Sequence, residues 1–481
     1  MTIDSAPGPG PDESVTGDLD VPSSPNGSGA APWVDPQRES FLVGLLAILV
    51  VAIVALQAMA PTPAASDEPT PPAQRVDLLL QGRYTLGASW LFERLGTLGE
   101  AQAAQLAGSL ERLDAEPAAA ICWAPVLDAL GDRDAADRVL GVAPSALDGD
   151  AALAARWLRD EADGRDETAD EALVRHCGWF GELALADARD DEAALADLRG
   201  DAVRLTVAVL AVALLAFGGL LVGSFIALFA YVNLRRGALT SGYRRDLDRV
   251  GAAVPGPARL AYLETMVFFL LGLQLLGVVT AVLFQTGIGT VALLAQWAIV
   301  PLMFWPLRRG ETRATLAAAI GWAKPASPLV EVACGLLAYL ASAPLLALGL
   351  VGSILMSQLV PQTPYHPVMD WVQGGDSMIA VLMVYMVATI WAPVVEETMF
   401  RGAFYHYLRG RFGVVRSAVL VALVFALIHP QGAIGVPFLT ALAVALAWTR
   451  EWRGSMLASM TMHAVHNALA ITFLFVVLGG G

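Results

Sequence analysis

The sequence predicts an all-α integral membrane protein, a polytopic bundle of about nine transmembrane helices with an inserted helical domain outside the cytoplasm. Three observations support this class. Hydrophobic residues make up 56% of the 481-residue chain and charged residues only 16%, a composition too apolar for an ordinary soluble enzyme. Apolar runs long enough to span a bilayer recur along the chain, and one long acidic segment interrupts them.

The first 60 residues combine a polar tail with one apolar run. Residues 1–40 are rich in Pro, Gly, Ser and Asp, so they cannot bury enough apolar surface to offset the entropy of ordering, and we expect a disordered cytoplasmic tail. No basic region opens this tail, which argues against a cleaved signal peptide. Residues 41–60 then form an apolar run of about 20 residues, the length of a first transmembrane helix.

Residues 61–200 hold the negative charge of the chain. They contain 27 Asp and Glu against 12 Arg, a net −15, so the remaining 18 acidic and 18 basic residues cancel. Apolar residues recur at helical spacing, as at Ala152, Ala155 and Leu158, which predicts an all-helical domain. Two interpretations stay open: a compact domain without a groove, or a helical-repeat surface that binds a protein or peptide, although no fixed period is present.

The three cysteines make no metal-binding cluster in the sequence. Cys334 lies in an apolar segment, whereas Cys122 and Cys177 share the acidic domain. These two either form a disulfide, if the domain faces an oxidising compartment, or are two unrelated buried thiols.

Beyond residue 200 the apolar runs follow one another almost without pause. We assign residues 201–376 to membrane helices that precede a catalytic core at 377–478. The expected spans are 203–232, 260–284, 288–306, 329–356, 377–395, 417–429, 433–449 and 455–478.

The positive charges between these runs set an orientation, because cytoplasmic loops carry the excess of Arg and Lys. Connections with clustered Arg or Lys alternate with connections near 285–289, 357–376 and 431–436 that contain none. This alternation places the amino-terminal tail in the cytoplasm and the acidic domain outside it. We therefore expect an integral protein of a bacterial inner membrane.

A few ionisable side chains fall at membrane depth, where each costs on the order of 3 kcal/mol. Counted back from the nearest cytoplasmic arginine at about 1.5 Å per residue, Glu396, His429 and His463 lie roughly 22, 20 and 15 Å deep. Three separate segments thus place polar groups at a similar depth, which predicts a shared site. The ionisable candidates are Glu396, Glu397, Arg401, His406, His429, His463 and His466, with Asn467 as a polar companion.

The turn at residues 429–432, His-Pro-Gln-Gly, is a further indication of a cavity. The apolar run before it has about 13 residues and reaches only about 20 Å, short of a hydrocarbon core of roughly 30 Å. Irregular backbone at such a depth is tolerated where it is buried in protein or lines a wet cavity.

Chemistry suggests a role for each acidic and basic candidate. Glu397 and Arg401 are four residues apart and can pair on one helix face, within the membrane or as a surface pair at a helix end. Glu396 then has no partner on its own helix. A carboxylate in an apolar pocket without a basic partner can act as a base on water. The alternative is that Glu396 simply lies among the lipid head groups.

The histidines and the asparagine suggest the rest of a site. His429 and His463 could share a proton with the base, polarise a carbonyl or hold a metal. Asn467 follows His463 by one helical turn and could donate to an oxyanion. We leave the other histidines outside the site: His176, His366, His406 and His466.

These residues resemble a known family when they are taken in order. Residues 396–401 (EETMFR), 425–429 (FALIH) and 463–467 (HAVHN) match the EExxxR, FxxxH and HxxxN motifs of the CAAX prenyl endopeptidase and bacteriocin-processing (CPBP) family of intramembrane proteases. The resemblance covers residues 377–478, about a fifth of the chain, and none of the acidic domain.

The resemblance implies an all-helical membrane core and specific roles. Glu396, assisted by His429, would activate water, while His463 and Asn467 would stabilise the oxyanion. Glu397 and Arg401 would support the base, with Phe425 packed beside His429. A divalent metal such as Zn²⁺ would be held by Glu396, His429 and His463 if one is used; we prefer activation of water by Glu396 itself.

Three functions remain open from the sequence. The first is an endopeptidase that cleaves a membrane-associated protein or peptide near the cytoplasmic face. The second is a non-catalytic scaffold or immunity-type protein that binds a partner through residues 61–200. The third is a transporter, which the absence of an evident inverted repeat disfavours. We expect no nucleic-acid partner.

Overall fold

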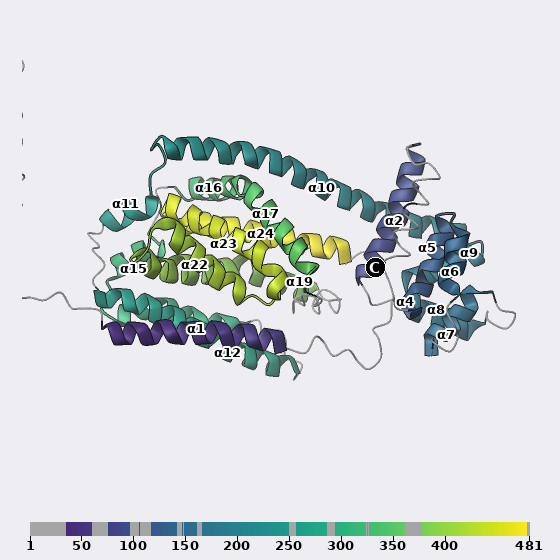
Figure 1. Cartoon of the computed structure of the whole chain (residues 1–481), viewed down its shortest axis with the longest axis horizontal. Helices are drawn as coiled ribbons and strands as arrows, with labels where there is room; N and C mark the ends of the chain where they lie inside the picture. The colour runs from purple at the N-terminus through teal and green to yellow at the C-terminus, as the bar shows by residue number, and fades with distance from the viewer. Residues whose placement is uncertain are drawn as a thin grey trace, which may run out of the picture.

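The computed structural model is helical throughout the part of the chain that it describes, which is residues 35–59, 76–96, 105, 117–141, 147, 149–160, 166–249, 256–285, 294–323, 325, 327–360 and 378–478. Figure 1 shows two groups of helices, a larger bundle and a smaller group, joined by the long helix α10 (Glu192–Arg235). The all-α prediction is confirmed for the described residues.

Among the described residues, five helices are long and apolar enough to cross a membrane, or six spans if one bent pair counts as a unit. The bent pair is α16 (Pro328–Ala341) and α17 (Ala343–Ser357), which meet at 48°. The five spans are Pro36–Gln57, Glu192–Arg235, Leu260–Thr280, Val381–Arg409 and Gly432–Arg453. They lie in helices α1 (Pro36–Met59), α10, α12 (Gly256–Gln285), α19 to α21 (378–409) and α23 (Gly432–Arg453).

The structure thus supports a polytopic helical membrane protein with fewer qualifying helices than the nine that we expected. The described part of the run at 288–306 contains a short helical segment, η4 (Gln296–Phe304) followed by α14 (Trp305–Arg308), with Pro301 inside η4. Helix α22 (Val414–Leu427) has only 14 residues and so reaches about 21 Å. Hydropathy alone does not separate such short segments from full spans.

The segment from Met378 to Arg409 is helical without interruption, well beyond the expected end at residue 395. Its α-helical parts are α19 (Met378–Met386), α20 (Ala392–Glu397) and α21 (Tyr405–Arg409), and two π-helical stretches, Val387–Trp391 and Thr398–Phe404, separate them. Pro393 has no amide hydrogen, and its ring would clash with the carbonyl four residues earlier in a regular α-helix. The wider π turn before it removes this clash and keeps the helix continuous.

The remaining helices of the bundle surround this segment. Helices α22 and α23 form a hairpin, and α24 (Met456–Leu478) returns across the bundle beside α20. Gly335 of α16 allows close packing on α24, because a Cβ at this position would lie 2.5 Å from the carbonyl oxygen of Ala458. Two short helices, α11 (Gly242–Arg249) and α15 (Arg313–Ile320), cover the end of the bundle away from the smaller group.

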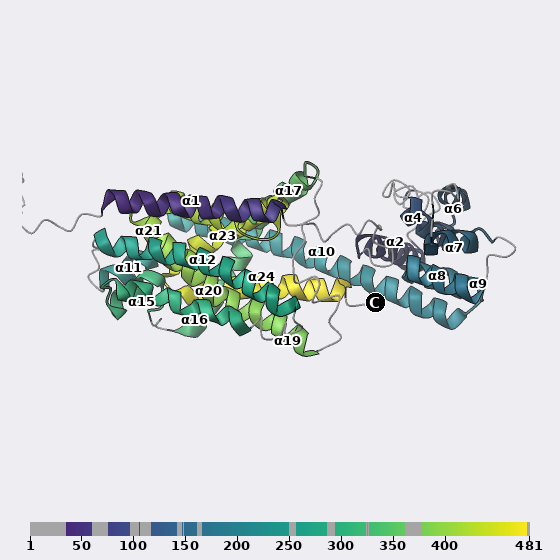
Figure 2. The same cartoon turned by 90° about the horizontal axis from the view of Figure 1, so that it is seen from below.

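The smaller group has a hydrophobic core of its own, built around Trp123, Leu173 and Phe180. Its helices are α2 (Val76–Arg94), α4 (Pro117–Ala120), η2 (Ile121–Trp123), α5 (Ala124–Ala129), α6 (Arg133–Leu140), α7 (Gly149–Leu158), α8 (Glu167–Cys177) and α9 (Trp179–Ala188). Helix α10 completes the core with Leu198. The boundary expected at residue 200 falls inside this 44-residue helix, which is about 66 Å long and continues from the smaller group along the larger bundle (Figure 2).

A disulfide links Cys122 to Cys177, with the two Cα atoms 5.3 Å apart. Of the two interpretations of this cysteine pair, the structure supports the disulfide. The bond closes a loop across 55 residues, for which chain entropy predicts a stabilisation of about 4 kcal/mol.

His176 lies beside the disulfide and should make this group of helices sensitive to acid. Its Nε2 atom lies 2.7 Å from the carbonyl oxygen of Ala118. Burial lowers the pKa of His176 below its ordinary value of 6.5, against the opposing effects of the Ala118 bond and of Asp150. Since the unfolded chain then binds a proton more readily than the folded chain, stability should be lost as the pH falls below 6.5.

We therefore expect faster deuterium exchange in α8 at about pH 5.5 than at about pH 7.5, after correction for intrinsic rates. The full chain in nanodiscs is the sample. The variant His176→Gln keeps a donor for Ala118 but cannot titrate, so it should show a smaller difference. An equal pH effect in both proteins would contradict the assignment to His176.

Candidate active site

The candidate site begins with an ion pair that has no contact with solvent. Glu397 and Arg401 lie one turn apart on the Met378–Arg409 helix, with both side chains 0% exposed and Nη1 of Arg401 2.9 Å from Oε1 of Glu397. The same carboxylate oxygen lies 3.0 Å from Nδ1 of His463 on α24. The alternative of a surface ion pair at a helix end is wrong, since the pair ties two helices together inside the bundle.

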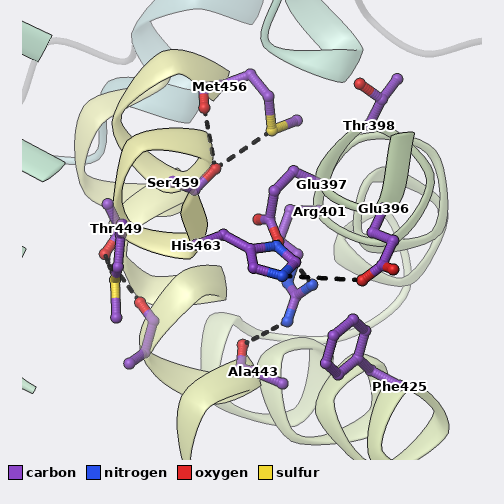
Figure 3. A network of polar contacts seen from close by, with 12 residues as sticks. Glu396, Glu397, Thr398, Arg401, Phe425, Ala443, Thr449, Met456, Ser459 and His463 are labelled. Atoms are coloured by element: carbon purple, nitrogen blue, oxygen red, sulfur yellow. Dashed lines mark hydrogen bonds and ion pairs between the residues drawn. The ribbon is translucent and has the colours of Figure 1, made fainter. Parts of the chain in front are cut away.

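Glu396 points to the other side of this helix, toward two imidazoles. Its Oε2 atom lies 3.8 Å from Nε2 of His429 and 3.9 Å from Nε2 of His463. The side chains of Glu396 and His429 are each 19% exposed, whereas that of His463 is 4% exposed. Figure 3 shows Glu396 and His463 facing each other, with the ring of Phe425 close by. Three segments thus meet at one carboxylate.

The second nitrogen of each imidazole has a defined partner. Nδ1 of His463 donates to Glu397, and Nδ1 of His429 lies 2.5 Å from the carbonyl oxygen of Phe425, to which it donates. Both rings therefore direct Nε2 at the carboxylate of Glu396. Because neutral rings of this tautomer offer lone pairs there, a close contact between Glu396 and either ring requires a shared proton.

Phe425 separates the charged and the reactive parts of the site. Its ring lies 4.4 Å from the Arg401 guanidinium carbon and 4.1 Å, between centroids, from the ring of His429. The contact with Arg401 is a cation–π interaction in a desolvated place. The phenyl ring thus contacts both the guanidinium of Arg401 and the imidazole of His429.

Asn467 lies on the same helix as His463 but has a backbone partner. Its Nδ2 atom donates to the carbonyl oxygen of Ala388 at 2.8 Å. Ala388 belongs to the π turn Val387–Trp391, where the widened helix leaves a carbonyl available. One of the two amide hydrogens of Asn467 is therefore used to hold this turn.

A family comparison agrees with this geometry. The model of the Rce1-like family, type II CAAX prenyl endopeptidases, matches residues 378–469, which hold all three motifs. Residues 378–469 form a domain of this CPBP family. The domain makes the protein a member of an intramembrane protease class, which implies a lipid bilayer around it and a peptide substrate. No curated protein and no solved structure matches the chain at significant similarity.

The residues of this CPBP domain do not fit a metal ion as they are placed. The donors of a tetrahedral Zn²⁺ lie about 3.5 Å apart, given bonds of about 2.1 Å. Glu396, His429 and His463 are not among the described sets of three ligands whose atoms all lie within 4.8 Å of one another. The set that does meet this distance is Cys122, His176 and Cys177, where the two sulfurs are joined in the disulfide. We therefore derive no step through a metal.

The histidines that we left outside the site lie elsewhere in the described structure. Nδ1 of His466 is 3.3 Å from the hydroxyl of Tyr339, and Nδ1 of His406 is 2.7 Å from the hydroxyl of Tyr243. His176 belongs to the smaller helix group, and His366 lies outside the described residues. None of the three described rings contacts Glu396 among the interactions of the described residues.

Several buried polar residues of the membrane helices were missed by the sequence reasoning. Glu264, Glu331 and Glu451 are buried, and their partners are Arg309 at 3.1 Å, Arg453 at 2.6 Å and Arg409 at 3.0 Å. Because these glutamates lie near basic loops, the sequence alone does not distinguish them from charges at the level of the lipid head groups. Gln57 was missed as well, although it is the one amide side chain in the first apolar run and a polar group there needs a partner.

Proposed function

We propose that the protein is an intramembrane endopeptidase in which Glu396 is the general base. The observation that carries this proposal is the convergence of His429 and His463, from two further helices, on one carboxylate oxygen of Glu396. The distances of 3.8 and 3.9 Å from Oε2 of Glu396 to the Nε2 atoms of His429 and His463 are too long for direct hydrogen bonds. We place the attacking water molecule beside these three atoms. A membrane-associated protein or peptide would be the substrate.

In the proposed mechanism Glu396 takes a proton from this water while His429 orients it. The hydroxide oxygen forms a bond to the scissile carbonyl carbon, and negative charge develops on the carbonyl oxygen. His463 donates from Nε2 to that oxyanion when its ring is protonated, and the Glu397 carboxylate on Nδ1 stabilises the charged ring. Glu396 then passes its proton to the departing amine as the C–N bond breaks. The second amide hydrogen of Asn467 supplies a further donor.

The topology belongs to the same proposal. We assign the amino-terminal tail to the cytoplasm and residues 61–200 to an inserted domain outside it. The membrane bundle then has about nine spans, some of which are formed by helices too short to cross the bilayer alone. The Cys122–Cys177 disulfide supports this side for the domain, since such bonds persist in oxidising compartments. The domain is then placed to meet a substrate outside the cytoplasm.

The test is substrate trapping with Glu396→Gln. Proteins cross-linked to Glu396→Gln are compared with those cross-linked to the parent protein, and the carboxyl termini created by cleavage are mapped in cells with the parent. We expect cleaved products only with the parent and intact substrates enriched on the variant, with a loss of rate of at least about 100-fold.

The matched control is Glu311→Gln, which replaces a half-buried carboxyl outside the spans whose pKa burial raises. It should cleave like the parent. Normal cleavage by a folded Glu396→Gln protein would exclude Glu396 as the general base, whereas an absence of cleaved products with the parent itself would favour the scaffold or immunity-type function through residues 61–200.

A further inference from the structure

The turn that carries His429 is bonded to a helix outside the family domain. Nε2 of Gln57, near the end of α1, donates to the carbonyl oxygen of Ile428 at 2.8 Å. Helix α22 ends at Leu427, Ile428 is its C-cap, and His429 follows directly. The contact joins positions 371 residues apart in the chain.

The carbonyl of Ile428 needs such a donor because of the local sequence. The last carbonyls of a helix have no partner within the helix, and Pro430 offers no amide hydrogen. Two nearby carbonyl groups have backbone donors, because the amides of Ile428 and His429 donate to the carbonyl oxygens of Val424 and Ala426. The ring of His429 donates a hydrogen bond to the carbonyl oxygen of Phe425. The side chains of Gln57 and His429 thus each donate to one carbonyl at the end of the helix.

Helix α1 is fixed in position at its opposite end. Glu39 forms an ion pair with Nη1 of Arg411 at 2.9 Å and accepts a hydrogen bond from the hydroxyl of Tyr407 at 2.8 Å, both at the end of the segment that carries Glu396. Arg38 pairs with Glu264 of α12 at 2.5 Å. Glu39 and Gln57 are 18 positions apart, about 27 Å along the helix, so α1 spans the whole depth of the bundle.

Between these ends α1 presents one apolar face to the bundle core. The buried residues recur at helical spacing: Leu42, Leu46, Val50 and Ile53. Val54 and Leu56, on the other side, are exposed to 36% and 58%. The amide of Gln57 is therefore carried on a helix that is packed and bonded along its length, so it can hold Ile428 at a fixed place.

We propose that Gln57 is a positioning residue for His429, which makes α1 a necessary part of an active site whose motifs all lie in residues 378–469. Only the expected effect on the reaction rate rests on the proposed peptidase function. Without the bond, the end of α22 loses this hydrogen bond to α1, and the imidazole is no longer held at the carboxylate of Glu396. A displacement of about 1 Å at a reacting group costs up to about 100-fold in rate.

The first test does not need a substrate. Deuterium uptake of the peptide covering residues 426–433 is measured in full-length protein in nanodiscs for the parent, Gln57→Leu and Leu56→Ala. We expect severalfold faster exchange in Gln57→Leu and parent-like exchange in Leu56→Ala, with α12 unchanged in both. Unchanged exchange of 426–433 in Gln57→Leu would overturn the proposal, whether or not the protein is a peptidase.

The second test separates positioning from a general loss of structure. With a peptide recovered by the Glu396→Gln trap as the probe, Gln57→Leu should lower kcat about 10- to 100-fold with little change in KM. The variant Gln57→Glu can donate to Ile428 only while its carboxyl is protonated. Its kcat relative to the parent should therefore rise as the pH falls from about 8 to about 5. A pH-independent ratio would contradict the role of the amide hydrogen.

Discussion

Replacing Arg401 with methionine alone should destabilise the membrane core by about 3–5 kcal/mol and abolish activity. The change removes a charge that is 0% exposed and leaves the carboxylate of Glu397, also 0% exposed, without its cation. A carboxylate in that place has no water to solvate it, so the fold must distort or the group must take up a proton. Thermal unfolding of the purified protein in nanodiscs measures the loss.

The double variant Glu397→Gln/Arg401→Met separates the pair from its surroundings. It removes both charges at once, so no uncompensated charge remains, and it should regain most of the lost stability. It should stay inactive, because His463 then lacks the carboxylate on its Nδ1 atom. A double variant as unstable as Arg401→Met would show that packing against Phe425 matters more than the charge.

An exposed pair provides the control. The Arg411–Glu39 contact is 2.9 Å long, but the side chain of Arg411 is 46% exposed, so Arg411→Met should cost no more than about 1 kcal/mol. A loss comparable to that of Arg401→Met would contradict the importance of burial.

The cost of placing charge in a bilayer explains why the elements of the candidate site could be predicted from the sequence. Glu396, His429 and His463 stand out within apolar segments, and each must have a reason to be there. Helical spacing was sufficient to pair Glu397 with Arg401, because the two residues lie one turn apart. The structure brings these residues together, while their catalytic roles stay predictions.

Other features follow from backbone geometry that a hydropathy pattern does not contain. The π turns around Glu396 arise from Pro393 and from the packing of neighbouring helices, so the uninterrupted helix to residue 409 was not foreseen. The bond of Asn467 to Ala388 depends on one of these turns. The bond of Gln57 to Ile428 joins distant parts of the chain, and only the packing of α1 on the bundle determines it.

The two histidines that face Glu396 should respond differently to replacement. Both His429→Ala and His463→Ala should lower kcat about 10²- to 10⁴-fold, the usual range for groups that move or orient protons. Their effects on stability should differ. His463 is 4% exposed and donates to the buried Glu397, so its loss should cost about 1–3 kcal/mol, whereas His429 is 19% exposed and its Nδ1 atom donates to a carbonyl of its own helix, so its loss should cost less.

Parallel kinetics and thermal unfolding of the two variants test this difference, with His466→Ala as the control on the same helix as His463. His466 contacts Tyr339 and not Glu396, so its replacement should leave kcat within a few-fold of the parent. If His429→Ala keeps the parental kcat while His463→Ala loses it, water activation cannot depend on His429. The base would then work with His463 alone, and the position of the turn at Ile428 would matter less for the rate.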